Sequence, residues 1–398
     1  MRLLIPVFSP AHPELGGLTR VIAVAEAAIK RGHQVAFCAS GHIEATLRNR
    51  GYQVYAMPPS TVFGLPKSIS HKIGFNLQYV TLPFQSGRSF GDIWLLCVLA
   101  GFARKSFLKD LVAEGVKAVR SFRANALFTD YDPTAFLLHQ ITGLPIACTY
   151  SSVFKQGTSS FSWKLMFRAI APILKHYKQP LQTPDELLFT PSVFKIIPTI
   201  PELDDVDPSR SDVCYVGQLC EDIKNNSCSD FEFQDKKRYV FTYTGTGSIS
   251  LYSLRKILPQ IFTTNKNYIC FVGAQSIKTP QYYGSVEFHP YVNAEEILPY
   301  CDWTICHGGQ NTIVHSLRHS VPLIIFPGSI WERRYNAQKV EQTGAGFMGE
   351  SNNLTVEWIN NALKMQSECA KQAKILSDQI YSYGGADSAI EEIEQKFF

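Results

Sequence analysis

The chain has 398 residues, of which 45% are hydrophobic and 18% charged, and its formal net charge is +4. This length exceeds what one hydrophobic core usually supports, so we expect two domains. The charge is too small over this length for a nucleic-acid-binding surface, and no nucleic-acid partner is expected. The ten cysteines contain no C-x-x-C pair and no Cys/His cluster at zinc spacing. We therefore expect reduced, packing cysteines in a cytoplasmic protein.

The N-terminus begins directly with an apolar segment, RLLIPVF, that predicts a β-strand. It lacks the basic region, long apolar run and small-residue cleavage site of a signal peptide. No stretch of 18 residues is free of polar and charged side chains, so we expect no membrane-spanning helix.

Strand and helix patterns alternate along the first 150 residues. The predicted elements are, in chain order, the strand RLLIPVF (2–8), the helix GLTRVIAVAEAAIKRG (17–32), the strand HQVAFCAS (33–40), the strand ANALFTD (124–130), the helix PTAFLLHQITG (133–143) and the strand PIACTYS (145–151). Asp132 stands where it would cap the helix that begins near Pro133. This order predicts a parallel sheet with helices on both faces.

Two aromatic-rich stretches, 60–125 and 151–190, interrupt this alternation. Within the second, FSWKLMFRAIAPILKHYKQ (161–179) is amphipathic and basic, which predicts a helix packed on its own domain. A lid over an apolar ligand and a peripheral contact with a membrane surface are the alternatives.

A second alternating series follows the segment PTIPELDDVDPSRSD (198–212), whose prolines and aspartates indicate a linker. Its predicted strands are 237–243, 267–273, 286–292, 302–307 and 321–326, and its predicted helices are 250–262, 294–301, 311–320 and 336–346. We therefore predict an α/β fold of two doubly wound, Rossmann-like domains facing across a cleft. The expected domains are 1–203 and 204–380. A C-terminal helix (381–398), with Ser388 and Glu391 at capping-box spacing, either packs back on the first domain or stays apart from it.

Two loops of the second half combine glycines with hydrogen-bond donors directly after a strand. In ICHGGQNTIVHSL, glycines follow the strand and Asn311 and Thr312 open the helix. Free amides at a helix N-terminus bind anions, and glycine lets a phosphate approach the backbone. His307 can donate a ring N–H, and the loop TGTGS (244–248) could close the other side. Together they favour a nucleoside diphosphate.

The run HGGQNTIVHSLRHSVPLIIFPGSIWERRYNAQKVEQTGAGF resembles the donor-binding signature of family 1 glycosyltransferases, of the bacterial natural-product (macrolide) type or the UDP-glycosyltransferase type. The resemblance implies an inverting, metal-independent GT-B enzyme that uses a UDP or dTDP sugar as co-substrate and needs no cofactor. The donor-site residues that it implies are Thr246, Gly247, Ser248, Val292, Ala294, His307, Gly308, Gly309, Asn311, Thr312, His315, Glu332 and Arg333.

Three residues, at two places in the run, depart from the signature. His315 stands where most relatives have a glutamate that binds the ribose hydroxyls, which leaves uridine and thymidine both open. Glu332-Arg333 replaces the Asp-Gln pair that contacts the sugar hydroxyls. Because arginine only donates and stays charged, we hypothesise a modified or acidic donor sugar. The alternative is that Arg333 forms an ion pair with Glu332 or Glu341.

In this family the catalytic base is a histidine in the loop after the first strand, oriented by an aspartate that follows a later strand. Asp130, in ANALFTDYD, matches that aspartate. Counting back from the first helix places the base on Gly17, whereas counting forward from the first strand places it at or next to His12. We expect His12 to be the base, with Glu14 as the alternative. The glycine pair at the helix start also resembles retaining GT-B enzymes.

The sequence thus predicts transfer of a sugar to a hydroxyl of a small, largely apolar acceptor such as a natural product or a lipid, because the aromatic-rich stretches favour an apolar pocket. A catalytically silent relative that activates another transferase is a different class, and an epimerase lacks a recognisable carboxylate pair. The acceptor's identity and the choice between monomer and homodimer stay open.

Overall fold

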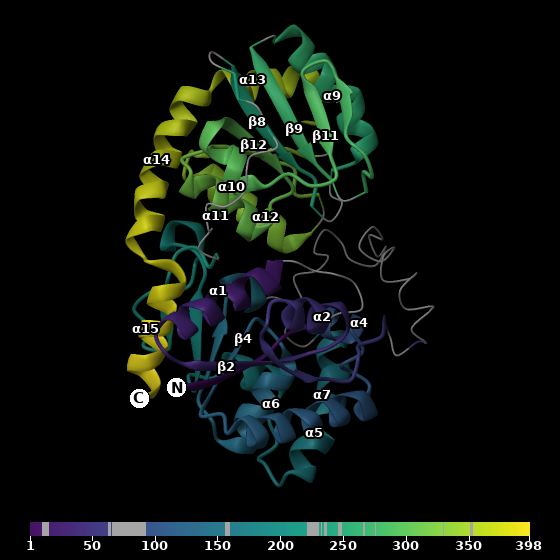
Figure 1. Ribbon diagram of the computed structural model, residues 1–398, viewed down its shortest axis with the longest axis vertical. Helices are drawn as coiled ribbons and strands as arrows, with labels where there is room; N and C mark the ends of the chain where they lie inside the picture. The colour runs from purple at the N-terminus through teal and green to yellow at the C-terminus, as the bar shows by residue number, and fades with distance from the viewer. Residues whose placement is uncertain are drawn as a thin grey trace.

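The structure is a computed structural model. It describes residues 1–9, 16–62, 65, 93–155, 160–220, 231, 233–234, 237–245, 249–265, 267–274, 276–328, 330–350 and 353–398. Two α/β domains lie one above the other, and helices α14 (Gln366–Ser382) and α15 (Gly385–Phe397) together run along one side of both (Figure 1). Of the predicted site residues, His12, Glu14, Thr246, Gly247 and Ser248 lie outside the described residues.

The first domain contains a seven-stranded parallel sheet in the order β3-β2-β1-β4-β5-β6-β7. Its strands are β1 (Arg2–Pro6), β2 (Gln34–Ala39), β3 (Gln53–Ala56), β4 (Ala126–Thr129), β5 (Ile146–Thr149), β6 (Val193–Ile197) and β7 (Val213–Tyr215). The central strands β4, β5 and β6 are buried along their whole length, which explains their unbroken apolar sequences.

Helices cover both faces of this sheet. The helices of the first domain are α1 (Gly16–Lys30), α2 (Gly41–Asn49), α4 (Ile93–Leu99), α5 (Lys105–Phe122), α6 (Pro133–Thr142), α7 (Phe161–His176) and α8 (Pro184–Phe189). Helices α1 and α2 share one core cluster with the C-terminal helix α15 (Gly385–Phe397), and α4 to α8 share the cluster on the other face. Helix α7, in the basic amphipathic segment, therefore packs on its own domain, as its pattern predicted.

The second domain has a seven-stranded sheet in the order β10-β11-β9-β8-β12-β13-β14, parallel except for the β10–β11 pair. Its strands are β8 (Arg238–Tyr243), β9 (Tyr268–Gly273), β10 (Gln281–Tyr283), β11 (Val286–His289), β12 (Cys301–Cys306), β13 (Leu323–Ile325) and β14 (Gly346–Met348). Its helices are α9 (Leu251–Thr264), α10 (Ala294–Ile297), α11 (Gln310–Arg318), α12 (Trp331–Gln342), α13 (Val356–Lys364) and α14 (Gln366–Ser382).

The domain division differs from the predicted boundary at residues 203 and 204. After the short 3-10 helix Pro201–Leu203, the chain adds β7 to the edge of the first sheet, and the second sheet begins only with β8. At the other end, α15 returns to the first domain and packs on α1. It begins at Gly385, so Ser388 lies inside the helix and does not cap it. The predicted capping box was therefore wrong.

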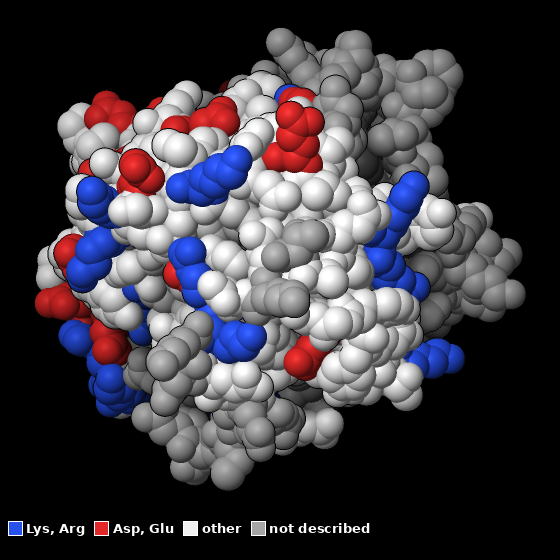
Figure 2. Space-filling model, turned by 90° about the horizontal axis from the view of Figure 1, so that it is seen from above, with Lys and Arg blue, Asp and Glu red and all other residues white. Residues whose placement is uncertain are grey.

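The described cysteines are all free. No helix among the described residues is both long and apolar enough to cross a membrane. On the end of the second domain seen in Figure 2, basic and acidic side chains are interspersed among uncharged ones. Among the residues coloured on that face, there is no large patch of one charge of the kind that binds nucleic acid.

Candidate active site

His307 lies at the carboxyl end of β12, where the chain turns into α11. Its side chain is 8% exposed, and its ring lies 5.6 Å from the ring of Tyr243, edge to face. A Cβ atom added to Gly309 would lie 2.7 Å from the His307 Nε2, and one added to Gly245 would overlap the same ring. These two glycines therefore make room for the imidazole. The sequence pattern indicated phosphate binding alone for the glycines and did not reveal this packing role.

The imidazole of His307 is neutral. Burial, and then the positive charge of Arg333, lower the pKa of His307 to about 3. Its Nδ1 is a buried atom without a hydrogen-bond partner among the described residues. A neutral ring with one unused nitrogen at a helix start can donate to, or accept from, a ligand placed there.

The loop between His307 and α11 has the backbone of an anion site. Gly308 has a φ of 91°, and a Cβ there would lie 2.9 Å from the carbonyl oxygen of Arg333. Asn336 holds this turn by donating its Nδ2 to the Gly308 carbonyl at 3.0 Å. Gly309 is the N-cap of α11 and forms no side-chain cap, so the first amides of the helix, including that of Thr312, face outward from its positive end.

Arg20, on α1, connects the two domains. Its Nε and Nη2 donate to the two carboxylate oxygens of Asp130 at 2.9 and 3.0 Å. Its Nη1 donates to the side-chain oxygens of Gln310 at 3.3 Å and Asn311 at 3.1 Å, in the first turn of α11. The side chains of Arg20 and Asp130 are only 14% and 7% exposed. The guanidinium of Arg20 therefore connects the N-terminus of α11, in the predicted donor site, to Asp130, the predicted catalytic aspartate.

Residues of the first domain also hold the Asp130 carboxylate in place. Thr149, at the end of β5, donates its hydroxyl to the Asp130 Oδ1. Gly17 lies against the same carboxylate, because a Cβ at residue 17 would overlap the Asp130 Oδ2. Counting back from the first helix had placed the catalytic base at residue 17. The structure shows that this residue, Gly17, contacts Asp130, the predicted catalytic aspartate.

Arg20 stays positively charged because of its acidic neighbours. Burial alone would lower its pKa, but Asp130 outweighs this effect and raises the pKa of Arg20 above its ordinary value. Glu332, at the start of α12, adds a smaller contribution in the same direction. The cleft between α1, α11 and α12 therefore contains a permanent positive charge beside two acidic groups.

His315 does not stand alone on α11. Its Nε2 hydrogen-bonds to the Glu295 carboxylate, and the Nε2 of His319 lies 2.9 Å from the other carboxylate oxygen. These histidines, despite the burial of the carboxyl group, hold the pKa of Glu295 well below its usual range. Glu295 follows Ala294 in the first turn of α10, three residues after the buried Val292, so this group borders the predicted nucleotide site.

Asp132 faces away from the Asp130 network. Between the two, Tyr131 has a φ of 65°, which turns the chain at the end of β4. Asp132 then caps α6, accepting from the backbone amide of Thr134 at 2.7 Å, so its predicted capping role is confirmed. Burial raises the pKa of Asp132 to about 6.

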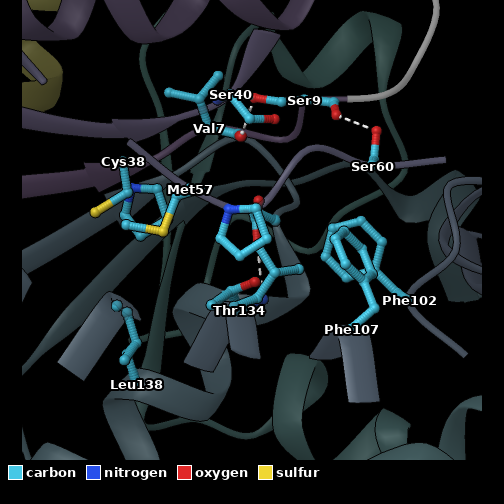
Figure 3. A pocket seen from close by; sticks show the side chains of 15 residues that line it. Val7, Ser9, Cys38, Ser40, Met57, Ser60, Phe102, Phe107, Thr134 and Leu138 are labelled. Carbon is cyan, nitrogen blue, oxygen red and sulfur yellow. Dashed lines mark hydrogen bonds between the residues drawn. The ribbon is translucent and has the colours of Figure 1, made fainter. Parts of the chain in front are cut away.

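A small apolar pocket opens at the carboxyl ends of β1 to β4, on the side of the sheet that faces α5 and α6 (Figure 3). Asp132 and Thr134 are among its polar lining residues, and Phe102 and Phe107, whose rings pack edge to face, are among its apolar ones. Its interior space of about 20 Å³ is room for one water molecule. Among the described residues, this pocket is therefore too small to hold a natural product.

Comparison with known proteins agrees with this arrangement. The family described as "Erythromycin biosynthesis protein CIII-like, C-terminal domain" matches residues 257–385. The crystal structure of the glycotransferase of kitacinnamycin superposes with a TM-score of 0.75 at 16% identity, over 99% of this chain and 98% of that one. The chain has the GT-B glycosyltransferase fold.

Two further glycosyltransferases extend this likeness. NDP-glycosyltransferase YjiC of Bacillus subtilis is 29% identical over 102 residues, 25% of this chain and 26% of the relative, so the alignment spans about a quarter of that protein. The spinosyn rhamnosyltransferase SpnG, whose structure was determined with thymidine diphosphate, has a TM-score of 0.66 at 16% identity over 99% of this chain and 100% of that one. The resemblance inferred from the sequence is confirmed, in sequence for the second domain and in fold for both domains.

The structure brings six predicted site features close together through mutual contacts and charge interactions: His307, the glycine turn, Asn311, Asp130, Glu332 and Arg333. Sequence reasoning missed Arg20, Thr149, Glu295 and His319. Arg20 was visible in GGLTR, one helical turn after Gly17, and that spacing was the available signal. The partners of Glu295 are 20 and 24 residues away in sequence, and nothing local indicated them.

Proposed function

We propose that this protein transfers a sugar from a nucleoside diphosphate donor to a hydroxyl of a small, largely apolar acceptor, with inversion at the anomeric carbon. The observation that carries the proposal is the turn at His307. A neutral, incompletely bonded imidazole and the uncapped start of α11 meet there, opposite a buried Arg20. A diphosphate that binds at the helix start would receive backbone N–H groups, the Thr312 hydroxyl and the Arg20 charge.

The donor nucleotide is proposed to be UDP or dTDP. Support comes from the relatives, since YjiC is named for nucleoside diphosphate donors and SpnG was crystallised with thymidine diphosphate. The first test measures release of UDP or dTDP from a panel of nucleotide sugars by the purified protein, with and without apolar acceptors. Turnover of none of them, with tight donor binding, would favour a catalytically silent partner of another transferase.

The sugar end of the donor is proposed to lie beside Glu332 and Arg333. Glu332 is close enough to influence Arg20, and Arg333 to influence His307, so both lie at the cleft. An arginine there favours a modified or acidic sugar over plain glucose. Replacing Arg333 by Gln should therefore change the order of preference among donor sugars, and an unchanged order would contradict this part of the proposal.

The acceptor is proposed to enter over the pocket floor formed by Phe102, Phe107 and Leu111 (Figure 3). Its reacting hydroxyl would then lie between this pocket and Asp130. The anomeric configuration of the product, read from NMR coupling constants, distinguishes inversion from retention. A retained configuration would favour the retaining GT-B mechanism suggested by the glycine pair at the start of α1.

His12 is proposed to be the base, with Asp130 as its orienting partner and Glu14 as the alternative base. Replacing His12 by Ala should lower turnover by about a hundredfold or more while donor binding stays within error. The same substitution at Glu14 serves as the matched control, since both residues stand in the sequence between β1 and α1. A loss of only a few fold for His12→Ala, with a large loss for Glu14→Ala, would reverse the assignment.

A further inference from the structure

Three side chains from two helices converge beside the predicted nucleotide site. One of them, His315, stands at the ribose-contact position of the family signature, and the transfer proposed above uses none of the three. Glu295 belongs to the first turn of α10, His315 to the last turn of α11, and His319 is the C-cap of α11. Their side chains are 17%, 21% and 15% exposed, so the group is partly buried and reachable from solvent. The carboxylate lies between the two imidazoles and bonds to the Nε2 atom of each.

This arrangement matches the ligand set of a divalent transition metal. His315 and His319 are four residues apart, which places both imidazoles on the same face of the helix. One ligand atom from each of the three residues lies within 4.8 Å of the others. Zinc takes imidazole nitrogen and carboxylate oxygen, and two histidines with one carboxylate leave a coordination position for water or a ligand. We propose that Glu295, His315 and His319 bind one zinc ion between α10 and α11.

The ligands are already oriented without the metal. Because one carboxylate holds both imidazoles, their Nε2 atoms point at a common center. Zinc binding needs the Nε2 lone pairs, so in the zinc-bound form each neutral ring carries its proton on Nδ1 instead of Nε2, and the ion replaces the two Nε2–H hydrogen bonds to Glu295. No large rearrangement of the two helices is required, and the ion would cross-link them.

The positive charge of Arg318 weakens the binding of a cation at this site. Its Nη1 lies 3.6 Å from the Glu295 Oε1 and 3.0 Å from the sulfur of Cys220. A guanidinium this close to the site repels a divalent cation, so the native site should bind zinc more weakly than its three ligands alone would allow. This repulsion gives the proposal a distinguishing consequence, because removing the charge of Arg318 should strengthen zinc binding.

The experiment uses the full-length protein, freed of metal with a chelator, and zinc chloride alone as the probe. Zinc is titrated by calorimetry and against a fluorescent zinc chelator, with circular dichroism to verify folding of each variant. We expect one equivalent of zinc bound by the native chain and at least a tenfold weaker affinity after His319→Ala or Glu295→Gln. Arg318→Gln should bind zinc about tenfold more tightly.

The matched control is His289→Ala. His289 also pairs with a glutamate, Glu287, at 3.1 Å, but no second histidine of the described part of the chain completes that pair. This variant should bind zinc as the native chain does. Cobalt substituted for zinc should give visible absorption bands that His319→Ala abolishes, which reports coordination directly.

The proposal is overturned if the native chain binds no more zinc than the Glu295→Gln/His319→Ala variant, or if Arg318→Gln does not raise the affinity. The second outcome does not depend on a ligand-deleting variant folding correctly. Neither measurement involves a sugar donor, so failure of the zinc site and failure of the proposed transferase function remain distinguishable.

Discussion

The Arg20–Asp130 pair is the contact on which the geometry of the cleft depends. Both side chains are nearly buried, and the pairing is bidentate. Replacing Arg20 by Met leaves the Asp130 charge buried with Thr149 as its remaining side-chain donor among the described residues, which should cost about 3 kcal/mol of unfolding free energy. Adding Asp130→Asn to the same chain should recover part of that loss, because the uncompensated charge is then gone.

A double-mutant cycle by urea unfolding measures this coupling. The matched control is Arg238 with Asp302, which is also bidentate, at 3.0 and 3.2 Å, but 40% and 25% exposed. Arg238→Met should cost about 1 kcal/mol or less. Equal losses at the two pairs would mean that the buried pair contributes no more to stability than a surface pair.

At the residue scale, the sequence predicted which residues belong to the site better than it predicted which side chains they contact. His307 was found because it directly follows a strand, where α/β sheets place their sites, and Asp130 because it matches the aspartate that the family resemblance implies after a later strand. The pairing of Asp130 with Arg20 spans 110 residues, and no local pattern encodes it. Gly17 gave a misleading signal, since its lack of a side chain makes room for the Asp130 carboxylate. The correct inference from a glycine at the expected base position was close packing.

At the scale of elements, the burial and length of each strand explain which strands the sequence predicted and which it did not. The apolar strands β1, β4, β5 and β12 were predicted because buried parallel strands have continuous apolar sequences. Strand β7 was not, since Val213–Tyr215 is only three residues long and follows a proline-rich segment. Its place in the first sheet is determined by pairing with β6, a tertiary effect.

The N-terminus of α6 gives a pH prediction. Asp132 has its pKa raised by burial from 3.8 to about 6, so the folded chain holds this proton more tightly than the unfolded chain. The stabilisation is complete below the unfolded value and is lost as the pH rises through about 6. Asp132→Asn keeps an N-cap acceptor and should be more stable than the native chain by about 1–3 kcal/mol at pH 8, with the difference disappearing near pH 4.

Urea unfolding at pH 4, 6 and 8 tests this dependence. Asp207→Asn is the matched control, because hydrogen bonds from Ser209 lower the pKa of Asp207 and the sign reverses. That substitution should remove stability at pH 8 and have less effect near pH 4. A pH-independent difference for Asp132→Asn would show that its carboxyl group is not held protonated in the folded chain.

At the scale of the whole molecule, the chain crosses twice between its domains, and the second crossing closes the structure. Helix α14 belongs to the second domain, whereas α15 packs on α1 of the first (Figure 1). Arg31 and His33 bind Glu394 on α15, at 2.6 and 2.5 Å. Helix α1 therefore lies between α15 on one side and, through Arg20, the start of α11 on the other. Its position couples the C-terminal helix to the cleft.

This coupling predicts a local effect for a substitution far from the site. Ile390, on α15, is fully buried in the core cluster that contains α1, so Ile390→Ala should cost about 2–5 kcal/mol. Ile375→Ala is the matched control, because Ile375 is 54% exposed on α14 and its loss should cost about 0.5 kcal/mol or less. Hydrogen exchange should show faster exchange in α1 for Ile390→Ala, while β12 and β13 keep their native protection. Equal loss of protection in both domains would mean that the two unfold as one unit and that α15 does not act on α1 specifically.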